Sequence, residues 1–471
     1  MKHLIIAILA VVIAALPSCI EDDFTTSSSD VLAFSTDTLS FDTVFTGEQT
    51  FTRRFLIYNR HKKQLRVERI YLSDMVEGVD FFINVDGNTS KEFSNVEIRG
   101  EDSAYVFVEA RIDRKNQALP FDVFAHLNFL TNGVTQSVVL HAAGQDAINL
   151  SNYRVERSVV MDSDMPYRVM DSIVVEKGAS LSILAGTRLY FHDKARIVVR
   201  GTLKMTGYCG KPVTLCGDRL DKVAGEIPFQ LMSGQWDGIY FAPESYGNTM
   251  KYVEMQGATA GVVVDSCAID RRKLYLLNSM LHNSASSTLK VAHAWVEATG
   301  CEFSDSRDGV VDLTGGRYAF NNCTFANYYL FDAITSPILS LYYLLPGQQT
   351  GEAPLMQADF NNCIIYGNAS DISEGDLTDS QVYLRNCLLR SEGADDDNFI
   401  YCVWGGDPKF FTKREDYIFD YRLRNESDAI GMGDPLLCPA DALIDRYGNQ
   451  RSLDSIIDIG AYVWIETKEE N

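Results

Sequence analysis

The sequence predicts an all-β protein: an N-terminal antiparallel β-sandwich, then a stack of parallel β-coils, then a closing C-terminal segment. Two observations predict this order. Short alternating strands separated by turn signals occupy residues 31–147, and one strand pattern recurs six times between residues 250 and 390. With 471 residues, 46% of them apolar, the chain is long enough for two or three domains with their own cores.

The first residues have the pattern of an export signal. Lys2 precedes an apolar run from Leu4 to Leu16 that is too short to span a bilayer, so we expect residues 1–18 to be a signal peptide. Leu16 opens a Leu-Pro-Ser-Cys sequence that resembles the lipobox of bacterial lipoproteins, which implies cleavage before Cys19 and acyl chains on that residue. The alternative is a plain secretory signal with an incidental cysteine.

An acidic run follows the cysteine. Residues 20–23, Ile-Glu-Asp-Asp, resemble the tag by which some Gram-negative bacteria place lipoproteins on the outer face of the outer membrane, although a solvated linker would have a similar composition. Residues 19–30 are expected to form a lipidated, flexible tether. The predicted location is therefore the outer membrane, through the N-terminal lipid and facing the exterior.

Residues 31–147 contain roughly seven short strands in about 115 residues, which favours an antiparallel sandwich. The strongest local signal is Asn132-Gly133 between two alternating runs, a combination typical of a hairpin. The runs at 39–45 and 55–60 resemble immunoglobulin-like domains found beside such anchors. That resemblance implies a spacer, with a binding module of its own as the alternative.

The recurring pattern of the second half has a small or apolar residue, a variable residue and a large apolar residue. The first of these positions is occupied by Val253, Ser279, Cys301, Cys323, Cys363 and Cys387. The steps between copies are 26, 22, 22, 40 and 24 residues, and a period in the low twenties indicates a solenoid. Copies stacked about 4.8 Å apart would bury one face of each strand. The step of 40 predicts an insertion of roughly 18 residues, placed within residues 328–356.

Residues at fixed distances from the repeat form columns. The column three residues earlier is apolar and should point inward: Met250, Leu276, Ala298, Phe320, Phe360 and Leu384. The column one residue later should point outward: Glu254, Met280, Glu302, Thr324, Ile364 and Leu388. Only its last two residues are apolar, so something is expected to cover them. The apolar part of the insertion is the nearest candidate.

The Asn-Cys-x-Phe copy at 322–325 and the sequence 236–241 resemble the right-handed parallel β-helix family, the pectate-lyase-like superfold. The resemblance implies a β-helix over residues 150–406. This superfold hosts lyases, hydrolases and adhesins, so it does not imply one activity. Residues 407–465, with Asp-Ile-Gly-Ala-Tyr at 458–462, resemble the closing segment of many bacterial β-helix proteins and are expected to cap the open end. A catalytic role for Asp445 or Asp458 is the alternative.

Charge and cysteine content narrow the partners. The net charge of -22 opposes phosphate backbones, so nucleic acid is not an expected partner. The cysteines of the repeat are expected to be small core residues. Cys209 and Cys216 lie seven residues apart and could pair, which the sequence leaves open, and no cysteines have zinc spacing.

The sequence has no familiar catalytic motif, and its seven histidines are scattered. A polysaccharide lyase would need a base and carboxylates that hold Ca²⁺, and Ca²⁺ is a cofactor here only if the protein is such a lyase. The candidates lie in two coils. One coil contains Asp265, Asp270, Arg271 and Arg272. The other contains Asp305, Arg307, Asp308 and Asp312. Two coils of 22 residues would place Asp308 almost on the face of Asp265, but about 10 Å away, too far to share one ion directly. Solvated turns and surface pairs are therefore the favoured interpretation.

The favoured function is a non-catalytic scaffold that binds polysaccharide or another surface component. The alternative is a polysaccharide lyase or glycosidase of the same superfold. A third possibility is an architectural part of a larger outer-membrane assembly.

Overall fold

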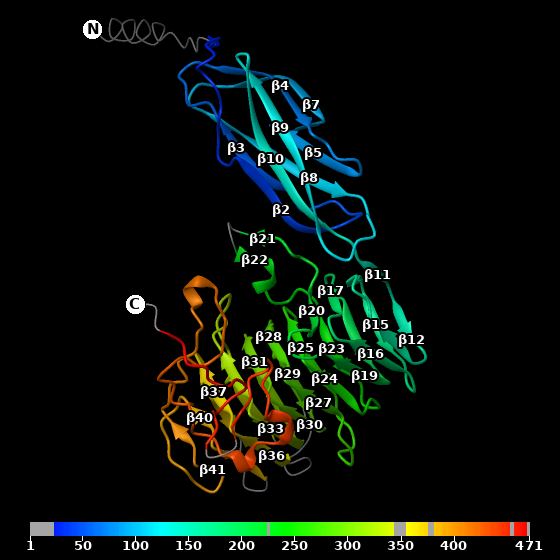
Figure 1. Cartoon of the computed structure of the whole chain (residues 1–471), viewed down its shortest axis with the longest axis vertical. Helices are drawn as coiled ribbons and strands as arrows, with labels where there is room; N and C mark the ends of the chain where they lie inside the picture. Colours follow the sequence, from blue (N-terminus) through cyan, green and yellow to red (C-terminus); the bar gives the residue numbers. More distant parts are fainter. Residues whose placement is uncertain (1–22, 224–226, 343–354, 375–380, 453–455, 469–471) are drawn as a thin grey trace, which may run out of the picture. The chain divides into compact units, whose positions relative to one another are not determined.

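The computed structural model describes residues 23–223, 227–342, 355–374, 381–452 and 456–468 (Figure 1). The predicted signal peptide and the predicted lipidation site, Cys19, lie outside the described residues. The chain divides into two compact units, residues 1–145 and 146–471. Among the described residues, no helix has the length and apolar character needed to cross a membrane.

The first unit is a β-sandwich of two five-stranded sheets. Sheet A has the order β1 (Ala33–Phe34), β3 (Arg53–Tyr58), β8 (Ser103–Ile112), β5 (Val79–Val85), β6 (Asn88–Ser90). Sheet B has the order β2 (Thr38–Phe45), β10 (Val134–Gln145), β9 (Phe121–Thr131), β4 (Leu65–Ser73), β7 (Glu92–Ile98). All neighbours are antiparallel except β2 and β10, which are parallel. The predicted hairpin is confirmed: Asn132 (φ 49°) and Gly133 (φ 77°) join β9 to β10.

Part of the predicted tether packs on this sandwich. The ring of Phe24 lies 4.0 Å from the guanidinium carbon of Arg66, and Phe24 forms a β-bridge to Gln64. Thr25 is buried and donates a hydrogen bond to Asp30 at 2.5 Å. These contacts join Phe24 to the sandwich and Thr25 to Asp30, while residues 26–29 are exposed.

The second unit is a parallel β-helix of three sheets. Sheet I contains β11 (Ile148–Leu150), β14 (Tyr167–Val169), β17 (Arg188–Phe191), β20 (Val213–Gly217), β25 (Val253–Gln256), β28 (Met280–Ser284), β31 (Glu302–Ser306), β34 (Thr324–Asn327), β37 (Ile364–Gly367), β40 (Leu388–Leu389) and β42 (Val403–Trp404). Sheet II contains β12 (Tyr153–Val155), β15 (Ser172–Val175), β18 (Arg196–Val199), β23 (Gly238–Phe241), β26 (Val262–Val264), β29 (Leu289–Ala292), β32 (Val311–Thr314), β35 (Leu339–Tyr342) and β38 (Ile372–Glu374). Sheet III contains β13 (Val159–Met161), β16 (Ser180–Leu184), β19 (Thr202–Thr206), β24 (Asn248–Lys251), β27 (Leu274–Leu277), β30 (Trp295–Thr299), β33 (Gly316–Asn321), β36 (Leu355–Asn361), β39 (Val382–Arg385) and β41 (Phe399–Ile400). Each coil visits the three sheets in this order, except the last, which passes from β40 to β41 without a strand in sheet II.

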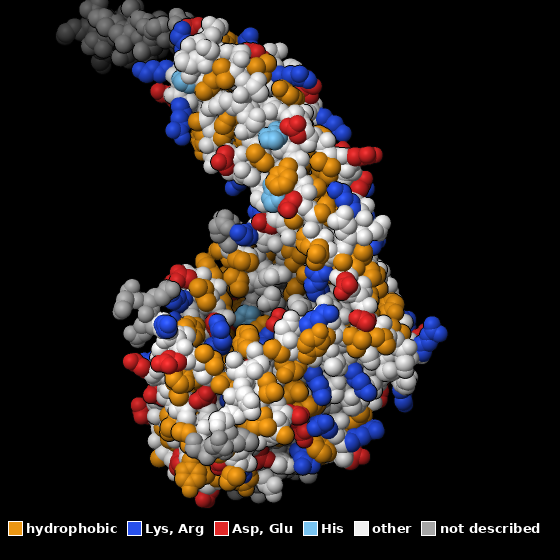
Figure 2. Space-filling model, in the orientation of Figure 1, with side chains coloured by type: hydrophobic (Ala, Val, Ile, Leu, Met, Phe, Trp, Pro, Cys, Tyr) orange, Lys and Arg blue, Asp and Glu red, His pale blue; other side chains and the backbone are white. Residues whose placement is uncertain are grey.

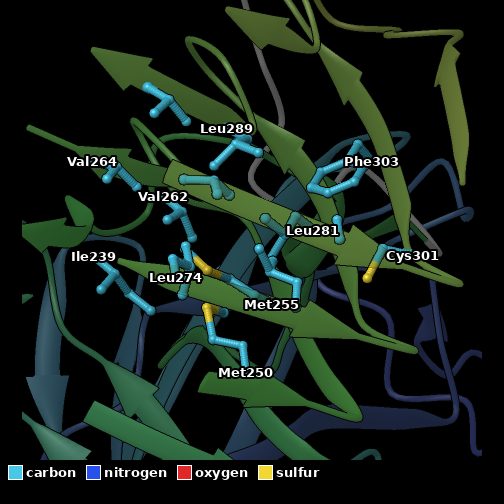
Figure 3. Packing of buried hydrophobic residues seen from close by; sticks show 14 of the residues in the cluster. Ile239, Met250, Met255, Val262, Val264, Leu274, Leu281, Leu289, Cys301 and Phe303 are labelled. Atoms are coloured by element: carbon cyan, nitrogen blue, oxygen red, sulfur yellow. The ribbon is translucent and has the colours of Figure 1, made fainter. Parts of the chain in front are cut away.

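The predicted inward column is confirmed. Met250, Leu276, Ala298, Phe320, Phe360 and Leu384 are direct register partners in sheet III, and each is at most 1% exposed. Side chains from all three sheets converge on this core in Figure 3. The four repeat cysteines are fully buried and unpaired, as expected of core residues. Trp236 is also fully buried, with its ring stacked 4.0 Å from that of Phe191, so it is a packing residue.

An asparagine with a backbone role precedes four of the six repeat positions, Ser279, Cys323, Cys363 and Cys387, whereas Gly300 precedes Cys301. Asn278, Asn322, Asn362 and Asn386 have φ values of 46–53°, at the corner between sheets III and I. Asparagine adopts this left-handed conformation at lower cost than most residues. Cys209 and Cys216, whose pairing was left open, are both free, Cys209 exposed and Cys216 buried.

The predicted insertion is divided. Strand β35 lies inside residues 328–356 but is an ordinary rung of sheet II, paired with β32 and β38. The additional residues fall in the two turns on either side of it, 328–338 and 343–354, the second outside the described residues. Ile364 and Leu388 are covered, as expected, but of the described residues of the insertion only Tyr328 packs against the cluster that contains them, while Leu339–Tyr342 belong to sheet II.

Residues 407–465, which we name the C-terminal strap, cover those side chains instead. Ile364 and Leu388 are buried in a cluster with strap residues Phe410, Tyr421, Leu423, Ala429, Ile459, Ala461 and Tyr462. Arg446 of the strap bonds Glu254 on β25, and Asn362 Nδ2 donates to the Asp434 carbonyl at 3.0 Å. The strap thus lies along the outer face of sheet I, whereas a cap over the open end was predicted. The apolar late rungs of that face explain the difference, because they need cover. The strap contains η2 (Arg414–Asp416), η3 (Pro435–Leu437) and η4 (Ala440–Ala442).

Candidate functional site

The first group of candidate catalytic residues, Asp265, Asp270 and Arg271, does not come together in one site. Asp265 follows β26, where it accepts hydrogen bonds from Tyr240 Oη at 2.6 Å and from the Ser266 amide at 2.7 Å. Asp270 and Arg271 are exposed in the turn between sheets II and III. The Arg271 guanidinium lies 3.8 Å from the ring centre of Tyr246. These residues form turn and surface contacts.

The second group is divided between two surfaces. Arg307 and Asp308 pair with each other at 2.9 Å in the turn between sheets I and II, whereas Asp305 is buried on the outer face of sheet I. The expectation that Asp308 shares a face with Asp265 is wrong. Val264 aligns with Val291 and then Leu313, so Asp265 lies at the far end of the sheet II strands. The coil containing β26 is longer than 22 residues, which shifts the count.

The structure brings together a polar cluster that the sequence did not predict. On the outer face of sheet I, Ser304 Oγ donates to Glu302 Oε1 at 2.6 Å, and His282 Nδ1 lies 2.9 Å from Ser304 Oγ and 3.3 Å from Asp305 Oδ2. Two strap tyrosines complete the cluster. Tyr421 Oη donates to Asp305 at 2.6 Å, and Tyr462 Oη donates to Glu302.

Burial controls the protonation of this cluster. It raises the pKa of Asp305 to about 7 and also raises the pKa of Glu302, while it lowers the pKa of His282. A carboxyl group that titrates near neutral pH beside an imidazole has the properties of a general acid or base. The chemistry alone would therefore suit an active site.

The space around the cluster is too small for a substrate. The cavity is lined by Leu231, His282, Asn283, Asp305, Tyr329, Leu330, Phe331 and Phe419, and its volume is about 10 Å³. A single water molecule needs about that much room. In this arrangement the cluster holds the strap to sheet I. Across the described ranges, no three His, Cys, Asp or Glu side chains are grouped so that they could hold a metal ion.

An accessible polar surface lies instead on the outer face of sheet III. We name it the sheet III face; it runs from β27 to β39 and consists of Tyr275, Trp295, Glu297, Arg317, Asn321, Gln357, Asp359, Asn361, Tyr383 and Arg385. All except Tyr275 are partly exposed. Four strand steps of about 4.8 Å give it a length of about 19 Å. Lys and Arg side chains are numerous over the strands labelled β19, β24 and β27 (Figure 2).

Contacts within the sheet III face orient its planar groups. The Arg317 guanidinium carbon lies 4.1 Å from the ring centre of Trp295, whose Nε1 donates to Glu297 at 2.9 Å. Further along, Arg385 pairs with Asp359 at 2.6 Å and lies 4.4 Å from the ring of Tyr383. The aromatic rings and the hydrogen-bonding side chains are therefore held in a fixed row.

Sequence reasoning missed this row, although a signal was present. Its residues lie two, four and six positions before each repeat cysteine, as in Trp295-x-Glu297 before Cys301. These positions alternate with the inward column and are polar or aromatic in successive copies.

No protein family matches the sequence, and no curated protein does. Three solved structures resemble parts of it. A protein of unknown function from Porphyromonas gingivalis W83 has 11% identity and a TM-score of 0.18 over 26% of this chain and 59% of its own. A family 123 glycoside hydrolase from Clostridium perfringens has 7% identity and a TM-score of 0.19 over 27% and 30%. The periplasmic chaperone SfaE has 9% identity and a TM-score of 0.16 over 25% and 58%, so this chain spans less than two thirds of each.

Proposed function

We propose that this chain is a lipid-anchored outer-membrane protein whose β-helix is a non-catalytic scaffold for polysaccharide at the cell surface. The single observation that supports the ligand is the sheet III face. Aromatic rings stack on the apolar faces of sugars, and planar carboxylate, amide and guanidinium groups bond neighbouring hydroxyls. A row about 19 Å long would contact several sugar units.

Two features favour binding over catalysis. Trp295, Arg317 and Asp359 lie on an open sheet face, where the carboxylates are already partnered: Asp359 by Arg385 at 2.6 Å and Glu297 by Trp295 Nε1 at 2.9 Å. Asp305 and His282, whose pKa values are shifted by burial, lie under the strap beside a cavity of about 10 Å³. The alternative, a polysaccharide lyase or glycosidase, requires the strap to leave sheet I.

The sheet III face can be tested by affinity electrophoresis against a panel of soluble polysaccharides. For the polysaccharide retained by the wild type, Trp295→Ala is expected to weaken binding about tenfold, which corresponds to roughly 1.4 kcal/mol. Arg317→Gln removes the guanidinium and keeps the ring, so it separates the two contributions. Tyr342→Ala is the matched control, because Tyr342 is 45% exposed on sheet II. Retention of no polysaccharide, or equal loss with the control, would contradict the proposal. The appearance of unsaturated sugar ends would favour the lyase.

The anchor is a separate part of the proposal. The Leu-Pro-Ser-Cys sequence ending at Cys19, followed by acidic residues, supports lipidation and surface exposure, and the sandwich would be an immunoglobulin-like spacer. Labelling with a fatty-acid analogue is expected in the wild type and absent in Cys19→Ala. Protease digestion of intact cells would show which face of the membrane the protein occupies.

A further inference from the structure

The two sheets of the sandwich have outer faces of different character. On sheet B, charged pairs predominate, such as Arg69 with Glu92 at 2.7 Å and Arg66 with Glu97 at 3.1 Å. The outer face of sheet A instead carries four aromatic side chains: Tyr58, Phe82, Tyr105 and Phe107. Phe82 and Tyr105 are 36% and 45% exposed. Sheet B also exposes a phenylalanine, Phe124, but the four rings of sheet A lie together on the adjacent strands β3, β8 and β5. Clustered exposed rings of this kind mark interaction sites.

Two of these rings, Phe82 and Phe107, border a hollow of about 360 Å³. It is lined by Thr52, Phe82, Ile83, Asn84, Thr89, Phe107 and Glu109. The volume lies within the range of about 300–1,000 Å³ that is typical of small-molecule sites. Aromatic side chains from two adjacent strands and polar groups on the rim combine as they do in such sites.

The polar groups of the hollow are oriented before any ligand arrives. Asn84 Nδ2 donates to Thr89 Oγ1 at 2.9 Å, and Asn84 Oδ1 accepts from the Gly87 amide at 3.1 Å. On the opposite side, the Glu109 carboxylate accepts hydrogen bonds from Thr52 and Gln49. Groups fixed in this way lose little conformational entropy when they bind hydroxyls.

We propose that this hollow is a second binding site, for a neutral hexose-based glycan. The aromatic rings suit the apolar face of a sugar ring, and the amide, hydroxyl and carboxylate groups suit its hydroxyls. Among the residues that line the hollow, Glu109 alone is charged and none is a lysine or arginine, which favours an uncharged ligand over an anionic one. The site is independent of the sheet III face, because it stands on the other compact unit.

The test uses the full chain and three soluble neutral polysaccharides: a β-1,4-glucan, a β-1,3-glucan and a mannan. Binding is measured by titration calorimetry in the Trp295→Ala background, so that the sheet III face does not mask the second site. Phe82→Ala is expected to weaken binding of the retained glycan at least about tenfold. Phe124→Ala, which removes a phenylalanine 50% exposed on sheet B, is expected to leave binding unchanged. Raising the salt concentration should have little effect, because the ligand is uncharged.

Three results would overturn the inference. One is that none of the three glycans binds in the Trp295→Ala background. Another is that Phe82→Ala and Phe124→Ala bind equally well. The last is that sedimentation shows a dimer of the wild type that Phe82→Ala dissociates, which would identify a second copy as the occupant. Each leaves the sheet III proposal standing if the wild type still binds polysaccharide through Trp295.

Discussion

Tyr421 of the C-terminal strap donates a hydrogen bond of 2.6 Å to Asp305 of sheet I, across 116 positions of sequence. Both side chains are at most 2% exposed. This contact joins the last part of the chain to the middle of the β-helix. It also places an ionisable carboxyl where its charge is costly.

The stability of the strap should therefore depend on pH through Asp305. Burial raises the pKa of this carboxyl from 3.8 to about 7, so the folded state holds its proton more tightly than the unfolded state. The contribution is fully favourable below pH 4 and is lost as the pH rises to 7, by about 4 kcal/mol at most. Asp305→Asn should remove this dependence and melt higher than the wild type at pH 8, with a smaller gain at pH 5. Asp308→Asn, whose pKa is lowered by Arg307, should show no gain at pH 8.

Tyr462→Phe should loosen the strap without removing it. The variant leaves the buried Glu302 carboxylate without the hydroxyl that donates to it, at a cost of about 1–3 kcal/mol. Hydrogen exchange at the amides of Ile459 and Ala461 is expected to become faster, while exchange in sheet A stays unchanged. Equal exchange in both proteins would show that the hydroxyl contributes nothing.

Thiol reactivity should follow burial along the cysteine column. Among the described cysteines, Cys209 is exposed, whereas Cys301, Cys323, Cys363 and Cys387 are fully buried. A thiol reagent should modify Cys209 rapidly in the native protein and the column only after denaturation. Cys209→Ser should abolish the fastest phase and leave the slower reaction of the half-buried Cys267, Cys402 and Cys438. Rapid modification of the column would mean that the coils open readily.

The corner asparagines should tolerate glycine better than alanine. Asn386 has a φ of 50°, and its amide donates to the Met432 carbonyl at 3.2 Å. Alanine in the left-handed region costs roughly 1–2 kcal/mol, which glycine avoids. The difference between the melting temperatures of Asn386→Ala and Asn386→Gly measures the cost of the left-handed backbone conformation, because both variants lose the side-chain amide contact. A glycine variant no more stable than the alanine variant would refute it.

The stacking of the coils was the part of the fold that the sequence repeat could predict. The inward column from Met250 to Leu384 and the outward column from Glu254 to Leu388 follow from one repeat, because each coil packs on its sequence neighbour. The strap could not be placed, since contacts such as Arg446 with Glu254, 192 positions apart, leave no periodic trace.

The site residues were harder to predict for two physical reasons. Turn lengths vary, and a count of 22 residues per coil misplaced Asp265 relative to Asp308. Outward side chains need not repeat in type, so Trp295, Arg317 and Gln357 form one column without a shared chemistry. Only the assembled sheet shows that they are neighbours.

The strap also determines when the outer face of sheet I becomes fully covered during folding. Ala326, Ile364 and Leu388 form an apolar stripe that is buried by residues after position 407. A chain interrupted during synthesis would carry complete coils and yet display this stripe to solvent, where chaperones and proteases recognise it. Complete cover of sheet I therefore depends on residues that follow every coil in the sequence.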